Sequence, residues 1–325
     1  MTSTTKKPPL HGQVALVAGA TRGAGRGIAR ALGEAGATVY CTGRSVRGEP
    51  SHYGRKETIE DTADLVTRAG GRGIAVRVDH AVEAEVKALF ERIRADEKRL
   101  DVVADGVGGE DPRLGGWGAS WETDLSAGAE ALRNALLSHV ITAKYASLLM
   151  IETKRKGLLV QVTEGDTVGG VGNALKGLVK GALKEMAARL AEELRPHGIA
   201  SIAITPGYLR SETMLEHFGV TEANWRDGAK KDPNFLESET PLFVGRAVAA
   251  LAADRNVLER TGDILSSWEL ARDYEFADAD GRRPDWGAHF AKNVVPAMSW
   301  MKAAFERNVA WLERQTRRAK SYVGG

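Results

Sequence analysis

Short apolar runs alternate with longer segments of helical periodicity between residues 12 and 281. The runs predict strands at 14–18, 38–42, 73–79, 100–104, 157–163, 199–205 and 263–267. The segments between them predict helices at 28–35, 56–69, 82–94, 122–154, 175–194 and 241–253, and short helices over a cleft at 209–229. Apolar strands that alternate with helices form parallel sheets covered on both faces. The predicted fold class is therefore α/β, a doubly wound Rossmann sheet of seven parallel strands, with ligands beyond the carboxyl ends of the strands.

The same pattern predicts one domain, residues 12–281, with a different segment on each side. Residues 1–11 are polar, lack the apolar core of a signal peptide, and are expected to be a disordered lead. Residues 282–325 are expected to be a C-terminal helical extension that packs on the domain or on a partner subunit, and the alternative is a lid over the substrate. Its apolar residues fall at roughly helical spacing: Trp286, Phe290, Trp300, Met301, Phe305, Val309 and Leu312.

The composition of the chain limits the kinds of partner and the cellular compartment that we expect. The 45 basic and 43 acidic residues give a net charge of +2, which does not favour nucleic acid as the main partner. Cys41 is the single cysteine, so no internal disulfide can form, and a small core residue in a reducing cytoplasm is expected. No apolar run reaches the roughly eighteen residues of a membrane span. We therefore expect a cytoplasmic protein that acts on a small molecule, with no membrane partner.

A glycine-rich turn joins the first strand to the first helix. Glycines at such a turn let the backbone approach a pyrophosphate, and the free amides of the helix N-terminus bind its negative charge. The spacing G-x3-G-x-G differs from the better-known G-x-G-x-x-G, so the flanking strand and helix support the assignment as much as the glycines do. The candidate contacts are Gly19, Thr21, Arg22, Gly23, Ala24 and Gly25.

The end of the second strand indicates which nucleotide is bound. An acidic residue usually ends this strand when the cofactor is NAD, because it binds the ribose hydroxyls. Here the strand continues into Thr42, Gly43 and Arg44, with no acidic residue. Two guanidinium groups, those of Arg22 and Arg44, suit a 2′-phosphate. The cofactor is therefore predicted to be NADP(H), unless both arginines are ordinary surface residues.

These features resemble the short-chain dehydrogenase/reductase superfamily over about residues 12–275. The resemblance is carried by the glycine turn, by Val78-Asp79, by the strand at 100–104 and by Thr205-Pro206-Gly207. It implies that Asp79 contacts adenine and that residues after Pro206 and Gly207 contact nicotinamide. Ser211 takes the hydroxyl position that holds the carboxamide. Asp105 and Gly106, after the fourth strand, are expected near the nicotinamide, although Asp105 could simply bond backbone groups in a turn.

The resemblance also implies an assembly. Superfamily members are usually dimers or tetramers that associate through the two long helices, here at about 122–154 and 171–195. A homodimer or homotetramer is therefore expected. Small residues in the second of these helices fit a close approach between helices: Ala182, Ala187, Ala188 and Ala191.

The catalytic pattern of the superfamily is altered in this chain. That pattern places a serine after the fifth strand and a Tyr-x3-Lys pair on the next helix. Counting back from the segment Glu193-Leu194-Arg195-Pro196 assigns these positions to Thr163, Lys176 and Lys180. Between Tyr145 and Tyr208 the sequence has no tyrosine, and the helix asparagine of the proton relay is matched only loosely, by Asn134. Lys180 is also expected to contact the cofactor.

A lysine in the tyrosine position has several possible roles. Two ammonium groups four residues apart on one helix destabilise each other's charged form, which suits a general acid, a general base or a Schiff-base nucleophile. Lys184 continues the row, so a basic helix surface is the alternative. Glu164 or Asp166 could act as a base or pair with Lys176. Tyr208 could be a surrogate proton donor or an aromatic wall.

The sequence therefore predicts an NADP(H)-dependent oxidoreductase that reduces a C=O, C=N or activated C=C bond of a small organic substrate, with Lys176 as proton donor. The alternatives are a non-redox cyclase, dehydratase or isomerase, or a nucleotide-binding protein without catalysis. Histidines 139, 197 and 217 lack ligand spacing, so no metal site is expected. Aromatic residues are expected to line a large apolar pocket, or else to be ordinary packing: the two tryptophans within 109–121, Phe218, Trp225 and Phe235.

Overall fold

The computed structural model describes residues 7–49, 54–108, 111–114, 119–153, 156–165 and 172–297. Within these ranges one parallel sheet has the order β3-β2-β1-β4-β5-β6-β7. This order reverses direction between β1 and β4, where a doubly wound sheet binds its ligand. The predicted fold class is confirmed. The strands are β1 (Val14–Ala18), β2 (Thr38–Gly43), β3 (Arg72–Arg77), β4 (Val102–Asp105), β5 (Gly157–Val162), β6 (Ile199–Thr205) and β7 (Ile264–Ser266).

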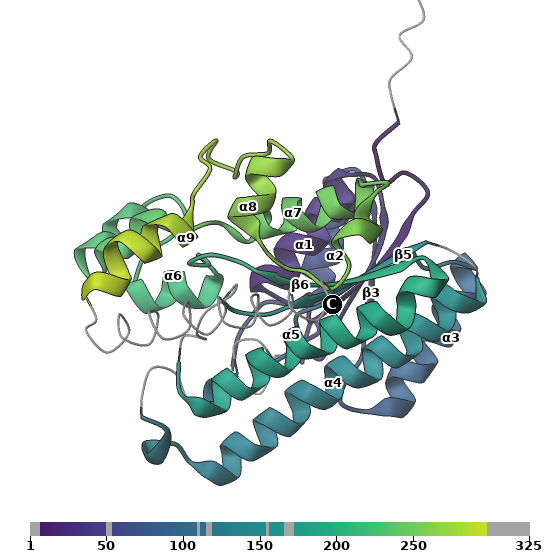
Figure 1. Cartoon of the computed structure of the whole chain (residues 1–325), viewed down its shortest axis with the longest axis horizontal. Coiled ribbons are helices and arrows are strands. Elements are labelled where there is room, and N and C mark those ends of the chain that lie inside the picture. The colour runs from purple at the N-terminus through teal and green to yellow at the C-terminus, as the bar shows by residue number, and fades with distance from the viewer. Residues whose placement is uncertain are drawn as a thin grey trace, which may run out of the picture.

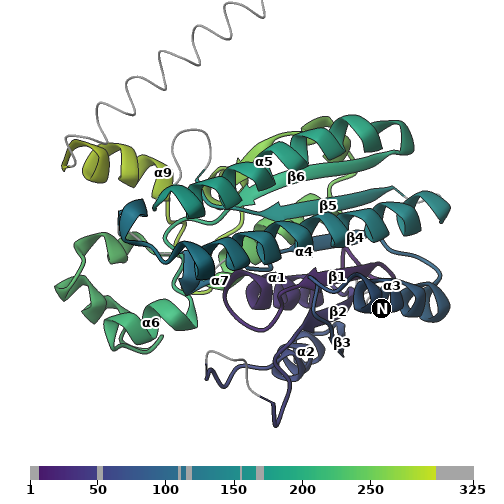
Figure 2. The ribbon, with the colours of Figure 1, turned by 90° about the horizontal axis from the view of Figure 1, so that it is seen from below.

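Helices cover both faces of the sheet, as Figure 1 shows. One face packs against α1 (Gly23–Glu34), α2 (Ile59–Arg68), α7 (Pro241–Ala253) and α8 (Ser267–Asp273). The other packs against α3 (Glu83–Glu97), α4 (Leu125–Glu152) and α5 (Ala174–Leu194), which lie in front of the strands in Figure 2. The five inner strands are almost entirely buried, whereas β3 at the edge is half-exposed. Burial on both faces explains why most strands are apolar along their whole length.

The first helix begins inside the glycine turn, five residues earlier than the predicted start at residue 28. It approaches α7 so closely that a Cβ atom on Gly27 would lie 1.8 Å from the carbonyl oxygen of Pro241. A Cβ atom on Gly245 would lie 2.3 Å from the carbonyl oxygen of Gly27. Only glycine permits such contact, so the small residues of both helices determine how α1 is placed below the crevice.

The packed part of the chain begins closer to the N-terminus than the sequence predicted. Leu10 is fully buried in the core, and its backbone N–H donates to the carbonyl of Ala35 over 2.8 Å. The prediction that residues 1–11 form a disordered lead is therefore wrong for Leu10, because its apolar side chain packs in the core. Residues 1–6 lie outside the described ranges.

Two segments beyond the sheet lie at its carboxyl edge. The first, between β6 and α7, contains α6 (Glu212–Phe218), η4 (Trp225–Lys230) and η5 (Pro233–Glu237), in agreement with the short helices predicted there. The second is the start of the C-terminal extension, with α9 (Trp286–His289), the π-helical turn η7 (Phe290–Val294) and η8 (Val295–Ala297). The predicted apolar positions from Trp300 to Leu312 lie outside the described residues.

Candidate active site

A crevice with a volume of 1370 Å³ follows the carboxyl edge of the sheet. Segments after β1, β2, β3, β4, β5 and β6 line it, together with residues of α4, α5, α6 and the C-terminal extension. The structure brings most of the predicted site residues to this one cavity: Gly19, Thr21, Arg22, Ala24, Gly25, Arg44, Asp79, Gly106, Thr163, Glu164, Lys176, Lys180, Pro206, Gly207 and Tyr208. Among the described candidates, three do not line it: Gly23, Asp105 and Ser211.

The glycine turn forms one end of the crevice. Gly19 has a φ of +76°, a conformation that favours glycine. A Cβ atom on Gly25 would lie 2.2 Å from the carbonyl oxygen of Gly19, so the turn can close only without side chains. Arg22, the residue before α1, makes no side-chain cap to the helix, and the first turn of α1 has no acidic residue. A glycine cradle at a helix N-terminus, open to a long crevice, fits a dinucleotide pyrophosphate.

Charged residues surround the adjoining end of the crevice. The Arg44 guanidinium lies 3.6 Å from the Asp79 carboxylate, and both side chains remain partly exposed. Glu57 is an acidic residue that the sequence did not single out. It accepts two hydrogen bonds from Arg55, of 3.1 and 3.0 Å. Burial opposes ionisation of Glu57, but the hydrogen bonds from Arg55 and the charge of Arg22 hold its pKa below the ordinary value. Arg44 is thus the more accessible cation at this end.

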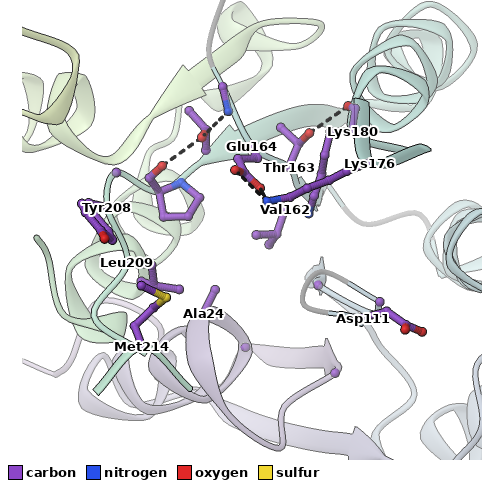
Figure 3. A pocket seen from close by; sticks show the side chains of 18 of the residues that line it. Ala24, Asp111, Val162, Thr163, Glu164, Lys176, Lys180, Tyr208, Leu209 and Met214 are labelled. Carbon is purple, nitrogen blue, oxygen red and sulfur yellow. Dashed lines mark hydrogen bonds and ion pairs between the residues drawn. The ribbon is translucent and has the colours of Figure 1, made fainter. Parts of the chain in front are cut away.

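The Lys176 ammonium is paired with the Glu164 carboxylate in the middle of the crevice. Its Nζ atom lies 2.9 Å from Oε2 and 3.1 Å from Oε1 of Glu164 (Figure 3). Lys176 belongs to the first turn of α5, where a positive charge is unfavourable to the helix dipole, and a carboxylate from the loop after β5 offsets that charge. The sequence offered two kinds of neighbour for Lys176, the ammonium of Lys180 and a carboxylate from Glu164 or Asp166. The structure places the Glu164 carboxylate against Lys176, because the end of β5 faces the start of α5.

Two neighbouring contacts hold this pair in position. The Asn173 side chain caps α5 by accepting a hydrogen bond of 3.0 Å from the Lys176 backbone N–H. The Thr163 hydroxyl donates to the Lys180 carbonyl over 2.9 Å and so ties the end of β5 to α5. Lys180 is buried and lines the crevice, whereas Lys184 does not line it. Asp166, the other predicted base, lies outside the described residues.

Tyr208 is part of the crevice wall. Its hydroxyl donates to the Asp232 carboxylate over 3.0 Å, and its ring packs edge-on against Phe235 and Trp286. Burial and the neighbouring carboxylate raise the pKa of Tyr208. A phenol with a raised pKa gives up its proton less readily than an ordinary tyrosine. This shift and the ring packing favour the alternative role, an aromatic wall, over the surrogate donor.

Ser211 and Asp105 turn away from the cavity. Ser211 is fully buried and caps α6 by accepting from the Met214 backbone N–H over 3.4 Å. This geometry does not offer its hydroxyl to a carboxamide in the crevice. Asp105 accepts from the Val107 backbone N–H over 3.0 Å, which is the turn role that the sequence left open. Its Oδ2 atom is buried with no hydrogen-bond partner among the described residues.

One buried histidine, His80, lies at the crevice. His80 lines the cavity and is hydrogen-bonded through its two ring nitrogens to the hydroxyls of Thr42 and Thr142, at 2.8 Å each. Burial lowers the pKa of His80. His80 directly follows the Val78-Asp79 motif, which is the signal in the sequence that could have indicated it. Among the described residues, no group of three or more histidine, cysteine, aspartate or glutamate side chains is arranged to hold a metal ion.

Most of the aromatic residues predicted for a pocket form a separate cluster. Phe218, Trp225 and Phe235 pack together, and only Phe218 also lines the crevice. Three guanidinium groups lie over the Trp225 ring. The distances from the ring centre to the Cζ atoms of Arg210, Arg226 and Arg282 are 4.0, 4.6 and 4.7 Å. Trp121 is 88% exposed, and Trp117 lies outside the described residues. Packing, the alternative interpretation, therefore holds for Trp225 and Phe235.

Comparison with known proteins gives the family. A model of the short chain dehydrogenase family matches residues 13–219. The chain belongs to the short-chain dehydrogenase/reductase family. It is 35% identical to mouse dehydrogenase/reductase SDR family member 1 over 302 residues, which cover 91% of this chain and 93% of that protein. It is 28% identical to the Escherichia coli oxidoreductase UcpA over 265 residues, which cover 76% and 90% of the two chains. The chain is therefore an oxidoreductase of this family.

Solved structures of the family share the fold. A short chain dehydrogenase from Mycobacterium thermoresistibile superposes with a TM-score of 0.70 at 19% identity, over 86% of this chain and 92% of the other. A protein described as an NAD(P) dependent gluconate 5-dehydrogenase, from Beutenbergia cavernae, was solved with NADP bound at low occupancy. It gives a TM-score of 0.61 at 24% identity, over 80% and 97% of the two chains. In the described part of the chain, no helix is both long enough and apolar enough to cross a bilayer.

Proposed function

We propose that this oxidoreductase uses NADP(H) to reduce a C=O, C=N or activated C=C bond of a small organic substrate, with the Lys176 ammonium as proton donor. The observation that carries the proposal is the Lys176–Glu164 ion pair, 2.9 Å long, in the crevice where the family sequence pattern places its tyrosine. In Figure 3 the pair lies above Ala24, with Tyr208 to one side.

The choice of NADP(H) rests on the charges at the end of β2. Arg44 lines the crevice with 47% of its side chain exposed, and Arg22 lines it from the glycine turn. A 2′-phosphate can bind such guanidiniums with two parallel hydrogen bonds, which a ribose hydroxyl cannot. The Asp79 carboxylate, 3.6 Å from Arg44, is a loose partner at the surface and does not prevent this. Arg22 and Arg44 would hold the phosphate. The pyrophosphate would bind to amides of the glycine turn other than that of Gly23, which donates to Glu212.

Bound NADPH would supply the hydride that the electrophilic carbon of the substrate accepts, and would leave as NADP⁺. The Lys176 ammonium then donates one proton to the oxygen or nitrogen that gains the electron pair, or to the carbon α to the activating group of a C=C bond. Ammonium and phenol groups have similar ordinary acidities, with pKa values of about 10.4 and about 10, so one can replace the other as a donor. Lys176 afterwards recovers its proton from water, so each cycle consumes one NADPH and one proton.

Glu164 positions the donor. Its carboxylate binds Nζ through both oxygens, and 30% of its side chain remains exposed, so water can reach the pair. An ammonium held in an ion pair lacks the free lone pair that a Schiff base requires. The structure therefore favours the proton-donor role of Lys176 over the nucleophilic one.

The test is turnover of NADPH by variants at position 176. The enzyme is incubated with NADPH and a panel of ketones, enones and imines, and the absorbance of the reduced nicotinamide is followed. Lys176→Met should lower kcat by about 10²- to 10⁴-fold, the usual contribution of a positioned acid, and leave the Kd of NADPH unchanged. Lys184→Ala is the matched control, since Lys184 lies on the same helix but not on the crevice.

Three results would contradict the proposal. Unchanged turnover in Lys176→Met would remove this residue from the chemistry. Product formation without net loss of NADPH would identify a non-redox enzyme that uses Lys176 and Glu164 as acid and base. Tight nucleotide binding with neither reaction would identify a protein without catalysis. In Lys176→Tyr, an increase in ketone reduction would show that the remainder of the ordinary site is intact.

A further inference from the structure

The C-terminal extension supplies the wall of the crevice opposite the nucleotide end. Trp286, Phe290 and Val294 line the cavity, and all three follow residue 281, where the predicted domain ends. They also lie beyond residues 13–219, which the family model matches. From the sequence we expect this extension to pack on the domain or on a partner subunit, with a lid over the substrate as the alternative. The structure shows that its described part reaches the cavity itself.

Trp286 is fixed directly above the turn that follows β6. A Cβ atom on Gly207 would lie 2.7 Å from the Cβ atom of Trp286, so the tryptophan is seated on the backbone of Gly207. This contact requires glycine at position 207. Because Gly207 follows Pro206 at the end of β6, Trp286 lies next to the segment that the family pattern places beside the nicotinamide.

Neighbouring rings hold the indole in one orientation. It meets the Tyr208 ring edge-on at 5.2 Å and stacks on His289 at 5.5 Å between ring centres. Phe290 lies 5.8 Å away at a tilt of 48°. The indole remains partly exposed and faces the cavity. A rigid aromatic surface that still contacts solvent is suited to packing against a ligand, because little side-chain entropy is lost on binding.

Most charged groups at this end have partners. The Arg272 guanidinium is paired with the Asp285 carboxylate. The Asp232 carboxylate accepts from Tyr208 and from the side-chain amide of Asn234, at 3.0 and 2.9 Å. Lys231 is exposed at the rim. This part of the cavity therefore offers apolar ring surface to a ligand, without a buried charge that would select an ionic one.

The volume of the crevice leaves space for such a ligand. A ligand pocket commonly measures about 300–1,000 Å³. The crevice measures 1370 Å³ and runs without a break from the glycine turn to the extension. A dinucleotide at one end would leave the aromatic end for a second molecule, with the Lys176–Glu164 pair between the two.

We propose that Trp286 determines substrate specificity, and that the substrate is an uncharged compound with an aryl ring that packs on the indole while its reducible bond points at Lys176. The inference rests on the proposed function for the identity of that bond. The ring-binding site does not depend on the proposed function, because it follows from the residues that form the aromatic wall.

Binding and turnover test the two proposals separately. The probe for binding is 2-naphthalenemethanol, titrated calorimetrically into the full-length protein with NADP⁺ present. The parent is expected to bind it, and Trp286→Ala is expected to weaken binding at least tenfold, with the Kd of NADP⁺ unchanged. Trp286→Phe keeps an aromatic wall and should lose less than Trp286→Ala. Trp121→Phe is the control, because Trp121 is 88% exposed and does not line the crevice.

Turnover is then compared between 2-acetonaphthone and acetone. The ratio of kcat/KM for the two ketones should fall at least tenfold in Trp286→Ala, through a rise in KM for the aryl ketone. Equal naphthyl binding in parent and Trp286→Ala, with native-like circular dichroism, would overturn the assignment of Trp286. Loss of binding in Trp286→Ala, while the parent consumes no NADPH with any ketone, would support the ring site and contradict the proposed reduction.

Discussion

The Glu212 carboxylate accepts a hydrogen bond of 2.8 Å from the backbone N–H of Gly23, and this contact joins the start of α6 to the start of α1. Its other oxygen lies 3.2 Å from the Arg26 guanidinium. One turn later on α6, Glu216 lies 2.7 Å from Arg55, in the segment between β2 and α2. Two carboxylates on one face of α6 thus fasten the substrate side of the crevice to the nucleotide side, although 189 residues separate Glu212 from Gly23.

Loosening this attachment should speed the release of the nucleotide. Glu212→Gln together with Glu216→Gln removes both charges with little change of shape, and we expect the dissociation rate of NADPH to rise about three- to tenfold, in line with roughly 1 kcal/mol for partly exposed ion pairs. Stopped-flow nucleotide fluorescence measures the rate. Glu185→Gln, which breaks an exposed pair with Arg189 on α5, is the control. A dissociation rate equal to that of the parent would show that α6 does not retain the nucleotide.

Arg44 should distinguish the two nucleotides. Arg44→Ala is expected to raise the Kd of NADPH at least tenfold, about 1.4 kcal/mol, and to change the Kd of NADH less than about twofold, because only NADPH carries a phosphate for the guanidinium. Isothermal titration measures both. Arg47→Ala is the control, since Arg47 is paired with Asp61 and Asp64 and does not line the crevice. Equal losses for both nucleotides, or a parent that prefers NADH, would refute the NADP(H) assignment.

Glu239 should make stability depend on pH. The residue is buried below Gly207, where it accepts hydrogen bonds from the Gly207 N–H and the Ser267 hydroxyl. Burial raises its pKa to about 8, Asp278 adds to this effect, and the hydrogen bonds and Arg210 oppose it. The folded protein therefore binds one more proton than the unfolded chain between about pH 4.5 and pH 8. The contribution of this group to stability is greatest below that window and is lost as the pH rises through it, by up to about 1.4 kcal/mol per unit.

The variant Glu239→Gln tests this dependence, since it keeps the acceptor oxygen and does not ionise. We expect the unfolding free energy of the variant to exceed that of the parent by an amount that grows from pH 5 to pH 8. Denaturant titrations at several pH values measure the difference. Parallel curves for the two proteins would show that Glu239 does not titrate in this window.

The exposed face of α4 and α5 should form a contact between subunits. Five large apolar side chains of these helices are exposed, Leu125, Leu137, Val140, Leu148 and Leu178, with exposed fractions of 67, 36, 54, 53 and 61%. Sedimentation of the parent should show a homodimer or homotetramer, and Leu148→Glu with Leu178→Glu should shift it to the monomer, because the interface would bury two carboxylates. Val82→Glu, at a 42% exposed position before α3, is the control. A monomeric parent would refute the assembly.

The alanines predicted to bring these helices together show where sequence reasoning reached its limit. Ala187 and Ala191 of α5 are buried within their own chain, so they pack α5 onto the sheet. Small residues at helical spacing indicate that another element packs closely against the helix. They do not indicate whether that element belongs to the same chain or to another subunit. The exposed leucines and Val140 are the residues that the predicted interface would bury, and only the folded structure separates them from the buried alanines.

The order of strands and helices and the glycine turn could both be predicted from the sequence, because each is encoded by residues close together along the chain. Local periodicity marks a strand or a helix, and the rules of parallel connection then leave few topologies. Cys41 is fully buried in the core, which confirms its predicted role, and burial raises the pKa of its thiol to about 12. The start of α1 was missed because glycines inside a helix weaken the helical pattern.

The chemistry of the crevice depends on contacts that only the tertiary structure could decide. Lys176 faces the carboxylate of Glu164 and not a second ammonium, the Tyr208 hydroxyl is engaged by Asp232, and Trp286 is seated on Gly207. Each contact joins residues from different elements. No local pattern records such a distance, since it results from how the sheet, the helices and the extension pack against one another.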